Sequence, residues 1–112
     1  MLAESYTAII ARGEDWVDGS TTEPYEASWA REATIMVRTL ETGTLTAGAK
    51  AHVQMSLDGI NWVDEGTNLD IPTKVNGVSL ARLNHFGHYL RLRASMPVNA
   101  TGFMLATLSL KA

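Results

Sequence analysis

The sequence predicts an all-β chain, folded as an antiparallel β-sandwich of about seven or eight strands with a jelly-roll-like arrangement. Turn-forming pairs recur at short intervals, and the segments between them are too short for typical helices. Several of these segments also alternate between apolar and polar residues, as a half-buried strand does. The turn-forming pairs are Asp18-Gly19, Thr42-Gly43, Ala47-Gly48, Asp58-Gly59, Glu65-Gly66, Asn76-Gly77, Phe86-Gly87 and Thr101-Gly102.

Two segments, residues 50–56 and 88–94, show the clearest alternation. Their apolar faces are Ala51, Val53 and Met55 in the first segment, and Leu90, Leu92 and Ala94 in the second. Strict alternation of this kind predicts strands with one face in the core and one face in water.

The other strands are expected from weaker patterns. Residues 33–40 are apolar on both faces, which suits a central strand, and residues 102–110 resemble them and would close the domain. Further strands are expected at residues 6–11, 61–64, 67–71 and 78–83. Pro72 cannot donate to a sheet ladder, so a strand should end before it.

Residues 17–28 contain a turn pair, several threonines, Pro24 and few apolar residues, which predicts a long loop. A helix over residues 26–34 is the less favoured alternative, because Trp29 and Ala33 share the spacing of one helical turn. With the favoured loop, the segment 1–28 is a strand followed by a long loop, and we expect it to act as a contact arm.

Composition limits the function. The 112 residues fit a single domain, 1–112, and the net charge of −3 comes with scattered basic residues. Nucleic-acid binding needs clustered Lys and Arg, so we expect no nucleic-acid partner. The chain lacks cysteine, a long apolar run and a signal-peptide pattern at residues 1–5, so we expect no membrane partner and synthesis in the cytoplasm.

The most specific local pattern is Ser56-Leu57-Asp58-Gly59-Ile60-Asn61-Trp62. Asp58-Gly59 supplies the positive φ angle of a tight hairpin turn, and the side chains of Ser56 and Asp58 can bond back to the turn backbone. Trp62 then falls on the returning strand, and we expect it in the core. A metal or sugar role for Asp58 and Asn61 is the minor alternative.

This hairpin, together with residues 84–93 (Asn-His-Phe-Gly-His-Tyr-Leu-Arg-Leu-Arg), resembles two groups of proteins. One is the small β-sandwich virion proteins of bacteriophages, which carry a similar hairpin and strand. The other, more distant, is the discoidin-like galactose-binding jelly rolls. The resemblance covers roughly the second half of the chain, and it implies a fold more directly than a function.

No residue set predicts catalysis or metal binding. His85 and His88 stand three apart, which on a strand places them on opposite faces, and no carboxylate stands at ligand spacing beside them. A Gly-x-Ser-x-Gly turn and a phosphate-binding glycine loop are both missing from the sequence. We therefore expect no enzyme activity, no catalytic residue, no metal and no cofactor.

Three aromatic residues are candidates for an interface with another chain: Trp16, Tyr25 and Trp29. Trp16 stands among acidic residues and Trp29 follows a polar stretch, so neither is easily assigned to the core. Exposed Trp and Tyr side chains are typical anchors of protein interfaces.

Together these features favour a non-enzymatic structural protein of a bacteriophage virion, foremost a capsid decoration (cement) protein on the outer surface of the head. A tail or head-fibre component is the less favoured form of this role. The expected partner is the major capsid protein or another virion protein, with self-association, preferably as a trimer. The alternative is a carbohydrate- or ligand-binding jelly-roll module.

Overall fold

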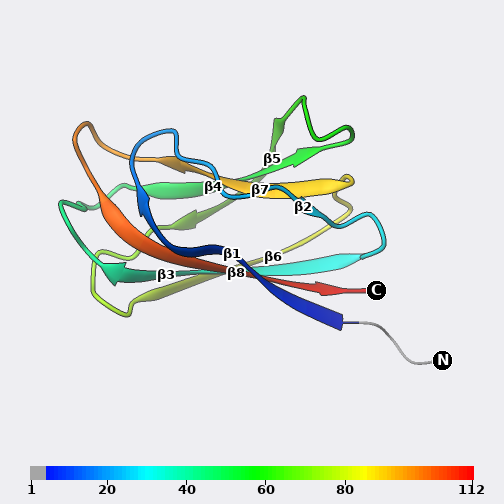
Figure 1. Cartoon of the computed structure of the whole chain (residues 1–112), viewed down its shortest axis with the longest axis horizontal. Coiled ribbons are helices and arrows are strands. Elements are labelled where there is room, and N and C mark those ends of the chain that lie inside the picture. The colour runs from blue at the N-terminus through cyan, green and yellow to red at the C-terminus, as the bar shows by residue number, and fades with distance from the viewer. Residues whose placement is uncertain (1–4) are drawn as a thin grey trace.

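A computed structural model describes residues 5–112 of the chain, and within that range it contains eight strands and no helix (Figure 1). The strands are β1 (Ser5–Trp16), β2 (Tyr25–Glu26), β3 (Glu32–Glu41), β4 (Lys50–Ser56), β5 (Val63–Asp70), β6 (Val78–Asn84), β7 (Tyr89–Ser95) and β8 (Gly102–Lys111). The predicted all-β class is confirmed. No helix in the described range could span a membrane.

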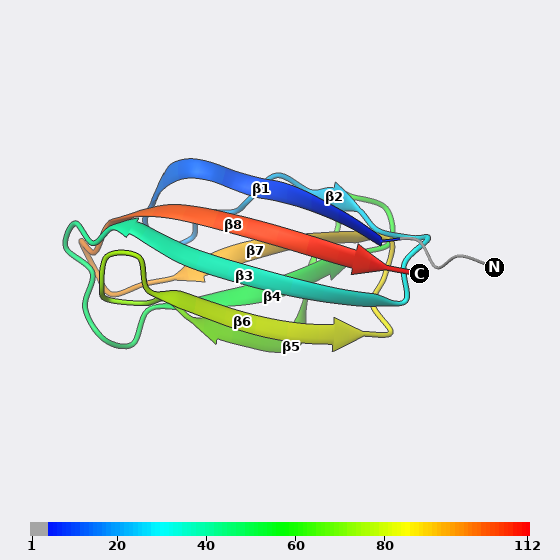
Figure 2. The same cartoon turned by 90° about the horizontal axis from the view of Figure 1, so that it is seen from below.

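The strands form two four-stranded antiparallel sheets packed face to face. One has the order β1-β8-β3-β6 and the other β2-β7-β4-β5, so most neighbours come from distant parts of the sequence. Figure 2 shows the first sheet in front of the second. Two four-stranded sheets connected in this way form a jelly roll, and the predicted sandwich is therefore confirmed.

The core lies between the sheets and consists of the inward side chains of the alternating strands. Along β7 and β8, every second residue from Leu90 and from Met104 is buried. The largest fully buried side chains are Trp16, Ile35, Leu90, Leu92, Met104, Leu108, Leu110, Val37 and Val53, together with Thr39. The strands predicted at residues 33–40, 50–56, 88–94 and 102–110 correspond to β3, β4, β7 and β8.

Strand β1 is longer than the residues 6–11 expected from the sequence, because it continues through two irregularities to Trp16. The register against β8 shifts between Ile9 and Ala11 and again between Arg12 and Glu14. Gly13, inside the second shift, has φ +68°, and a Cβ built there would lie 3.1 Å from the Phe103 ring. Gly13 is therefore part of a bulge and does not end the strand.

One strand, β5, replaces the two that we expected at residues 61–64 and 67–71. It contains Gly66, whose φ is +112°, and the register against β4 shifts between His52 and Gln54 on the opposite strand. The glycine lets the chain continue through this irregularity. Pro72 follows the end of β5, as predicted, and its carbonyl accepts a hydrogen bond from the Thr39 hydroxyl at 2.6 Å.

Residues 17–28, predicted as a long loop, also contain the short strand β2 and a bridge between Thr21 and Arg93. Backbone hydrogen bonds hold this segment along β7, from Gly19 N–H to the Ala94 carbonyl and from Ala27 N–H to the His88 carbonyl. The alternative helix over residues 26–34 does not form, since β3 begins at Glu32. The segment thus covers the side of β7 that would otherwise be a free sheet edge.

Candidate interaction surfaces

The three aromatic residues predicted to contact another chain lie in three different environments. Trp16 is 2% exposed and belongs to the core, so it offers no surface to a neighbour, and its expected exposure is wrong. Tyr25 is half-buried on β2, and Trp29 is 38% exposed in the connection from β2 to β3. Of the three, Tyr25 and Trp29 remain candidates for contact with another molecule.

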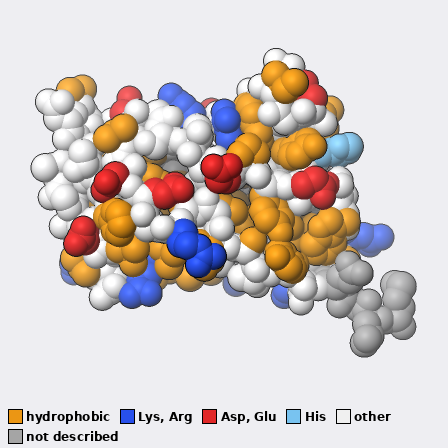
Figure 3. All heavy atoms as spheres, in the orientation of Figure 1, with side chains coloured by type: hydrophobic (Ala, Val, Ile, Leu, Met, Phe, Trp, Pro, Cys, Tyr) orange, Lys and Arg blue, Asp and Glu red, His pale blue; other side chains and the backbone are white. Residues whose placement is uncertain are grey.

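Tyr25 stacks against Tyr6 where the edges of the two sheets come together. The two ring centroids are 6.2 Å apart with an interplanar angle of 22°. Burial, with the Tyr6 hydroxyl beside it, raises the pKa of Tyr25. In the space-filling view, hydrophobic side chains gather on this side of the molecule near the end where the termini lie (Figure 3). The stacked pair is a partly exposed aromatic edge of the sandwich.

The hairpin between β4 and β5 is held by the side chains of Ser56 and Asp58. The Gly59 N–H donates to Ser56 Oγ at 2.8 Å, and the Ser56 hydroxyl donates to Asp58 Oδ1 at 2.9 Å. Asp58 Oδ1 also accepts the N–H groups of Ile60 and Asn61 at 2.8 Å, and Oδ2 accepts from Asn61 Nδ2 at 2.8 Å. These bonds fix the conformation of the turn, which rises above the second sheet (Figure 1).

The same bonds change the titration of Asp58. The backbone N–H groups of Asn61 and Ile60, and then the side chains of Asn61 and Ser56, hold the pKa of the Asp58 carboxyl far below its usual range. Gly59 has φ +77°, a conformation that favours glycine, so this position also defines the turn. The carboxylate of Asp58 therefore accepts its hydrogen bonds from groups of the same turn.

Trp62 lies on the outer face of the second sheet, so our expectation of a core position is wrong. It is half-buried, and the guanidinium carbon of Arg91 lies 4.2 Å from its ring centroid. Arg91 Nε donates to Gln54 Oε1 at 2.9 Å, and Gln54 Nε2 donates to Asp64 Oδ1 at 3.0 Å. Val63, the next residue, pairs with Met55 and points to the other side of the strand from Trp62, although at this end of the sheet Val63 is itself 56% exposed.

The outer face of the second sheet is therefore polar and satisfied by its own contacts. Besides the chain of contacts from Trp62 to Asp64, Lys50 Nζ pairs with Asp70 Oδ1 at 2.7 Å across β4 and β5. Burial, and then the nearby charge of Arg93, lower the pKa of Arg91. A face with this many side-chain contacts is suited to water.

The outer face of the first sheet is different, because apolar side chains cover its centre. We call these residues the apolar face: Ile9, Leu40, Met36, Val78, Leu80, Phe103 and Leu105. Leu80 and Val78 are 51% and 52% exposed, and Ile9 is 42% exposed. Arg12 and Arg82 lie on the edge strands, and Arg38 lies within the face, between Leu105 and Val78, where it donates a hydrogen bond to Asn76 Oδ1 at 2.7 Å.

The apolar face was not predicted from the sequence, since its residues come from four strands that are far apart in the chain. One signal was available: residues 33–40 are apolar on both faces, and we attributed this to a central strand. In a sandwich of two layers even a central strand has one outer face, so Met36 and Leu40 indicated an uncovered apolar surface.

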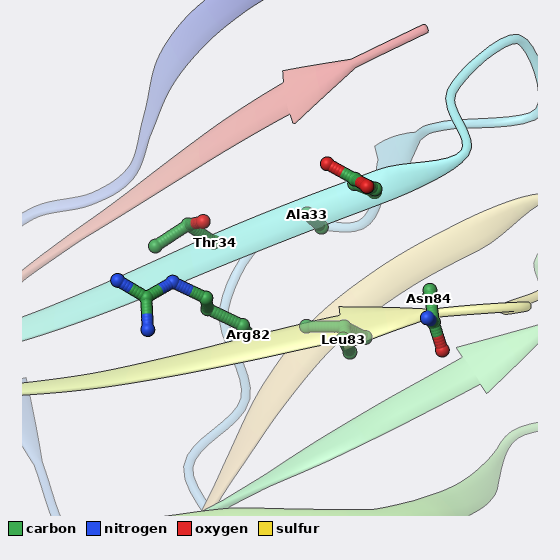
Figure 4. Close-up of a pocket in the computed structure, with 6 residues that line it drawn as sticks. Ala33, Thr34, Arg82, Leu83 and Asn84 are labelled. Carbon is green, nitrogen blue, oxygen red and sulfur yellow. The ribbon is translucent and has the colours of Figure 1, made fainter.

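Several hollows in the described part of the chain are open to solvent, and two of them bear on the candidate surfaces. One of about 260 Å³ lies between β3 and β6, where the Arg82 side chain extends toward β3 and Thr34 (Figure 4). The other, of about 300 Å³, lies beside the hairpin and is lined by Met55, Leu57 and Val63 among others. Within residues 5–112, no three His, Asp or Glu side chains gather closely enough to hold a metal ion.

Comparison with known proteins gives similarity of fold. No protein-family model matches the chain, and no curated protein matches its sequence. The crystal structure of the SPBc2 prophage-derived protein YomS is similar with a TM-score of 0.62 and 8% identity, over 100% of this chain and 96% of that one. A chain in the structure of infectious bursal disease virus, Gx strain, has a TM-score of 0.46 and 12% identity, over 97% of this chain and 32% of that one. The predicted resemblance of fold to a phage-derived β-sandwich is confirmed.

Proposed function

We propose that this chain is a non-enzymatic structural protein of a bacteriophage virion, and that it decorates the outer surface of the head. The observation that supports this most is the jelly roll shared along the whole chain with a prophage-derived protein. Jelly rolls serve many functions, including those of capsid and lectin domains, so the fold alone does not give the role. The proposed role also depends on the surfaces of this chain.

The surfaces support an assembly role because the chain presents apolar and aromatic groups to solvent from rigid strands. The apolar face covers the centre of the first sheet. Tyr25 lies on β2, an edge strand of the second sheet, and Trp29 lies in the connection from β2 to β3. Tyr and Trp side chains are common anchors of interfaces. We propose that residues 5–28 supply the contact with the major capsid protein or another virion protein, through Tyr25 and Trp29. Residues 1–4 of the expected contact arm lie outside the described residues.

Copy number in the virion distinguishes a decoration protein from a tail or head-fibre component. A decoration protein repeats with the capsid lattice, so its copies are comparable in number to those of the major capsid protein. A tail or fibre protein is present at a small fraction of that number. The expected trimer stays a prediction, since a single chain does not record the symmetry of its assembly.

Quantitative mass spectrometry of purified virions of the phage that carries this gene tests the proposal. We expect this chain in the particles at a number comparable to the major capsid protein. A small, fixed fraction would assign it to the tail or a fibre. Its absence from purified particles, with the chain present in infected cells, would reject a virion role.

A ligand-binding module is the second candidate, and the hollow beside the hairpin favours it. Met55, Leu57 and Val63 give this hollow of about 300 Å³ an apolar lining, and Asp58 and Asn61 stand at its border. Ligand sites combine an apolar lining with a few polar groups in this way. A glycan array tests it: binding that is lost in Val63→Lys would support the module, and no binding to any glycan would remove carbohydrate from consideration.

A further inference from the structure

The apolar face is a feature that contacts among residues 5–112 leave unexplained. Rows of residues run across the first sheet because opposed residues on antiparallel strands point to the same side. Through the register of the four strands, one row contains Ile9, Thr107, Met36 and Leu80, and the next contains Arg12, Leu105, Arg38 and Val78. Both rows point away from the core.

We infer that the apolar face packs against the same face of a second copy of this chain, about a two-fold axis that runs parallel to the strands. Such an axis places β1 of one copy over β6 of the other. Each row of one copy then faces the same row of the second copy, because rotation about this axis does not change the position along the strands. Ile9 then meets Leu80 of the second copy, and Thr107 meets Met36 of the second copy. Both contacts occur twice, because the interface is isologous.

The arginines on the face do not lie directly over one another in this pair. In this arrangement each arginine meets an uncharged residue: Arg12 lies over Val78, Arg38 over Leu105 and Arg82 over Thr7 of the second copy. No arginine is placed directly over another arginine, and the aliphatic stems of Arg12 and Arg38 can pack on the apolar side chains opposite them. Packed sheets rotate by about 30° relative to each other, which moves these contacts by a fraction of a strand spacing at the centre of the face.

The size of the face suits a modest interface. Four strands at about 4.8 Å spacing and about eight residues at about 3.4 Å per residue give an outline of about 500 Å². The accessible area of a corrugated face exceeds its outline, and a standard interface buries about 800 Å² on each partner. We therefore expect a dimer that forms with increasing concentration. A two-fold pair, in place of the trimer, is the closed assembly that this geometry gives.

The inference goes beyond the virion role and can be tested without a virion. Light scattering on the purified full chain should give twice the chain mass of 12.2 kDa at high concentration, and a mass that falls toward one chain on dilution. Ile9→Glu and Leu80→Lys should each give a monomer at the concentration where the natural chain is paired. Val98→Lys is the matched control, because Val98 is 90% exposed outside this face. It should leave the pairing unchanged.

The double variant Ile9→Glu with Leu80→Lys is the decisive measurement. Within one chain these positions lie on the two edges of the sheet, about 14 Å apart at the usual strand spacing, so they cannot form an ion pair there. Across the proposed axis they lie together, and the double variant should recover the pairing that each single variant loses. Thermal melts of all variants check that each one folds. A natural chain that stays monomeric, single variants that still pair, or a double variant that stays monomeric would each overturn the inference.

Discussion

The outer faces of the two sheets differ, although both belong to the same sandwich and enclose the same core. The second sheet carries a chain of contacts from Trp62 through Arg91 and Gln54 to Asp64, so its polar groups are largely satisfied within the molecule. The outer face of the first sheet carries aliphatic side chains instead, and Leu80 and Val78 are about half exposed there. One face satisfies its polar groups within the molecule, and the other leaves aliphatic side chains in water, which is the basis of the proposed contact with a second copy.

The largest expected effect concerns the core beneath both faces. Trp16→Ala should lower the free energy of unfolding by about 3–5 kcal/mol, because the indole is fully enclosed and its loss leaves a cavity. Urea denaturation measures the change. The matched variant Trp62→Ala, which removes the same side chain from an outer face, should cost far less. Equal losses for the two would contradict the assignment of Trp62 to the surface.

A smaller effect is expected at the hairpin that borders the polar face. Asp58→Asn removes the charge that accepts the turn N–H groups, so it should lower the melting temperature near neutral pH. The pKa of Asp58 is lowered in the folded state, so its stabilisation is complete above the ordinary aspartate pKa of about 3.9. It is lost as the pH falls from there through the lowered folded pKa.

Melting curves of both proteins between neutral pH and about pH 2 test this dependence. The gap in melting temperature between the natural chain and Asp58→Asn should narrow as the pH falls below the ordinary aspartate range. Asp70→Asn, at an exposed carboxylate outside the turn, is the control and should show little gap at any pH. A gap that stays constant with pH would mean that the charge of Asp58 does not stabilise the turn.

The contact between Arg91 and Trp62 should contribute less again. A double-mutant cycle with Arg91→Ala and Trp62→Ala should give a coupling energy of about 0.5–1 kcal/mol, the range of cation–π pairs at exposed sites. Urea denaturation of the four proteins supplies the cycle. A coupling energy near zero would show that the two side chains are neighbours without attraction.

The smallest effect is expected for the ion pair on the same face. Lys50→Met should change the free energy of unfolding by less than about 0.5 kcal/mol, because the Lys50 and Asp70 side chains are 43% and 78% exposed. Denaturation at low and at high salt measures it, and the small difference should vanish at high salt. A loss above about 1 kcal/mol that persists at high salt would mean that the pair is shielded from water.

The strands were predictable from the sequence where alternation is strict, as in β4 and β7. The hairpin was also predictable, since the bonding partners of Ser56 and Asp58 are only a few residues away. Trp16 was misplaced because its acidic neighbours suggested a loop. In the structure β1 continues through two bulges, and each bulge reverses the alternation, so the second one restores the inward direction at Trp16.

Features that depend on the register between distant strands could not be predicted from the sequence. The apolar face joins Ile9, Met36 and Leu80, whose positions across the sheet follow from the pairing of β1, β8, β3 and β6. Likewise, the contact of Trp62 with Arg91 requires β4 and β7 to be neighbours. Local propensity contains no information on these pairings, which is why the sequence predicted the fold class better than the surfaces.

The position of β8 has a consequence for synthesis. This strand is synthesised after the other seven, yet it lies between β1 and β3 and completes the first sheet. Until then, β1 lacks its partner, and β3 has β6 alone on one side. The first sheet therefore reaches its native pairing only after β8 has been made, and such non-local pairing is slow. Until then the nascent chain exposes unpaired apolar strands, the kind of surface that favours aggregation.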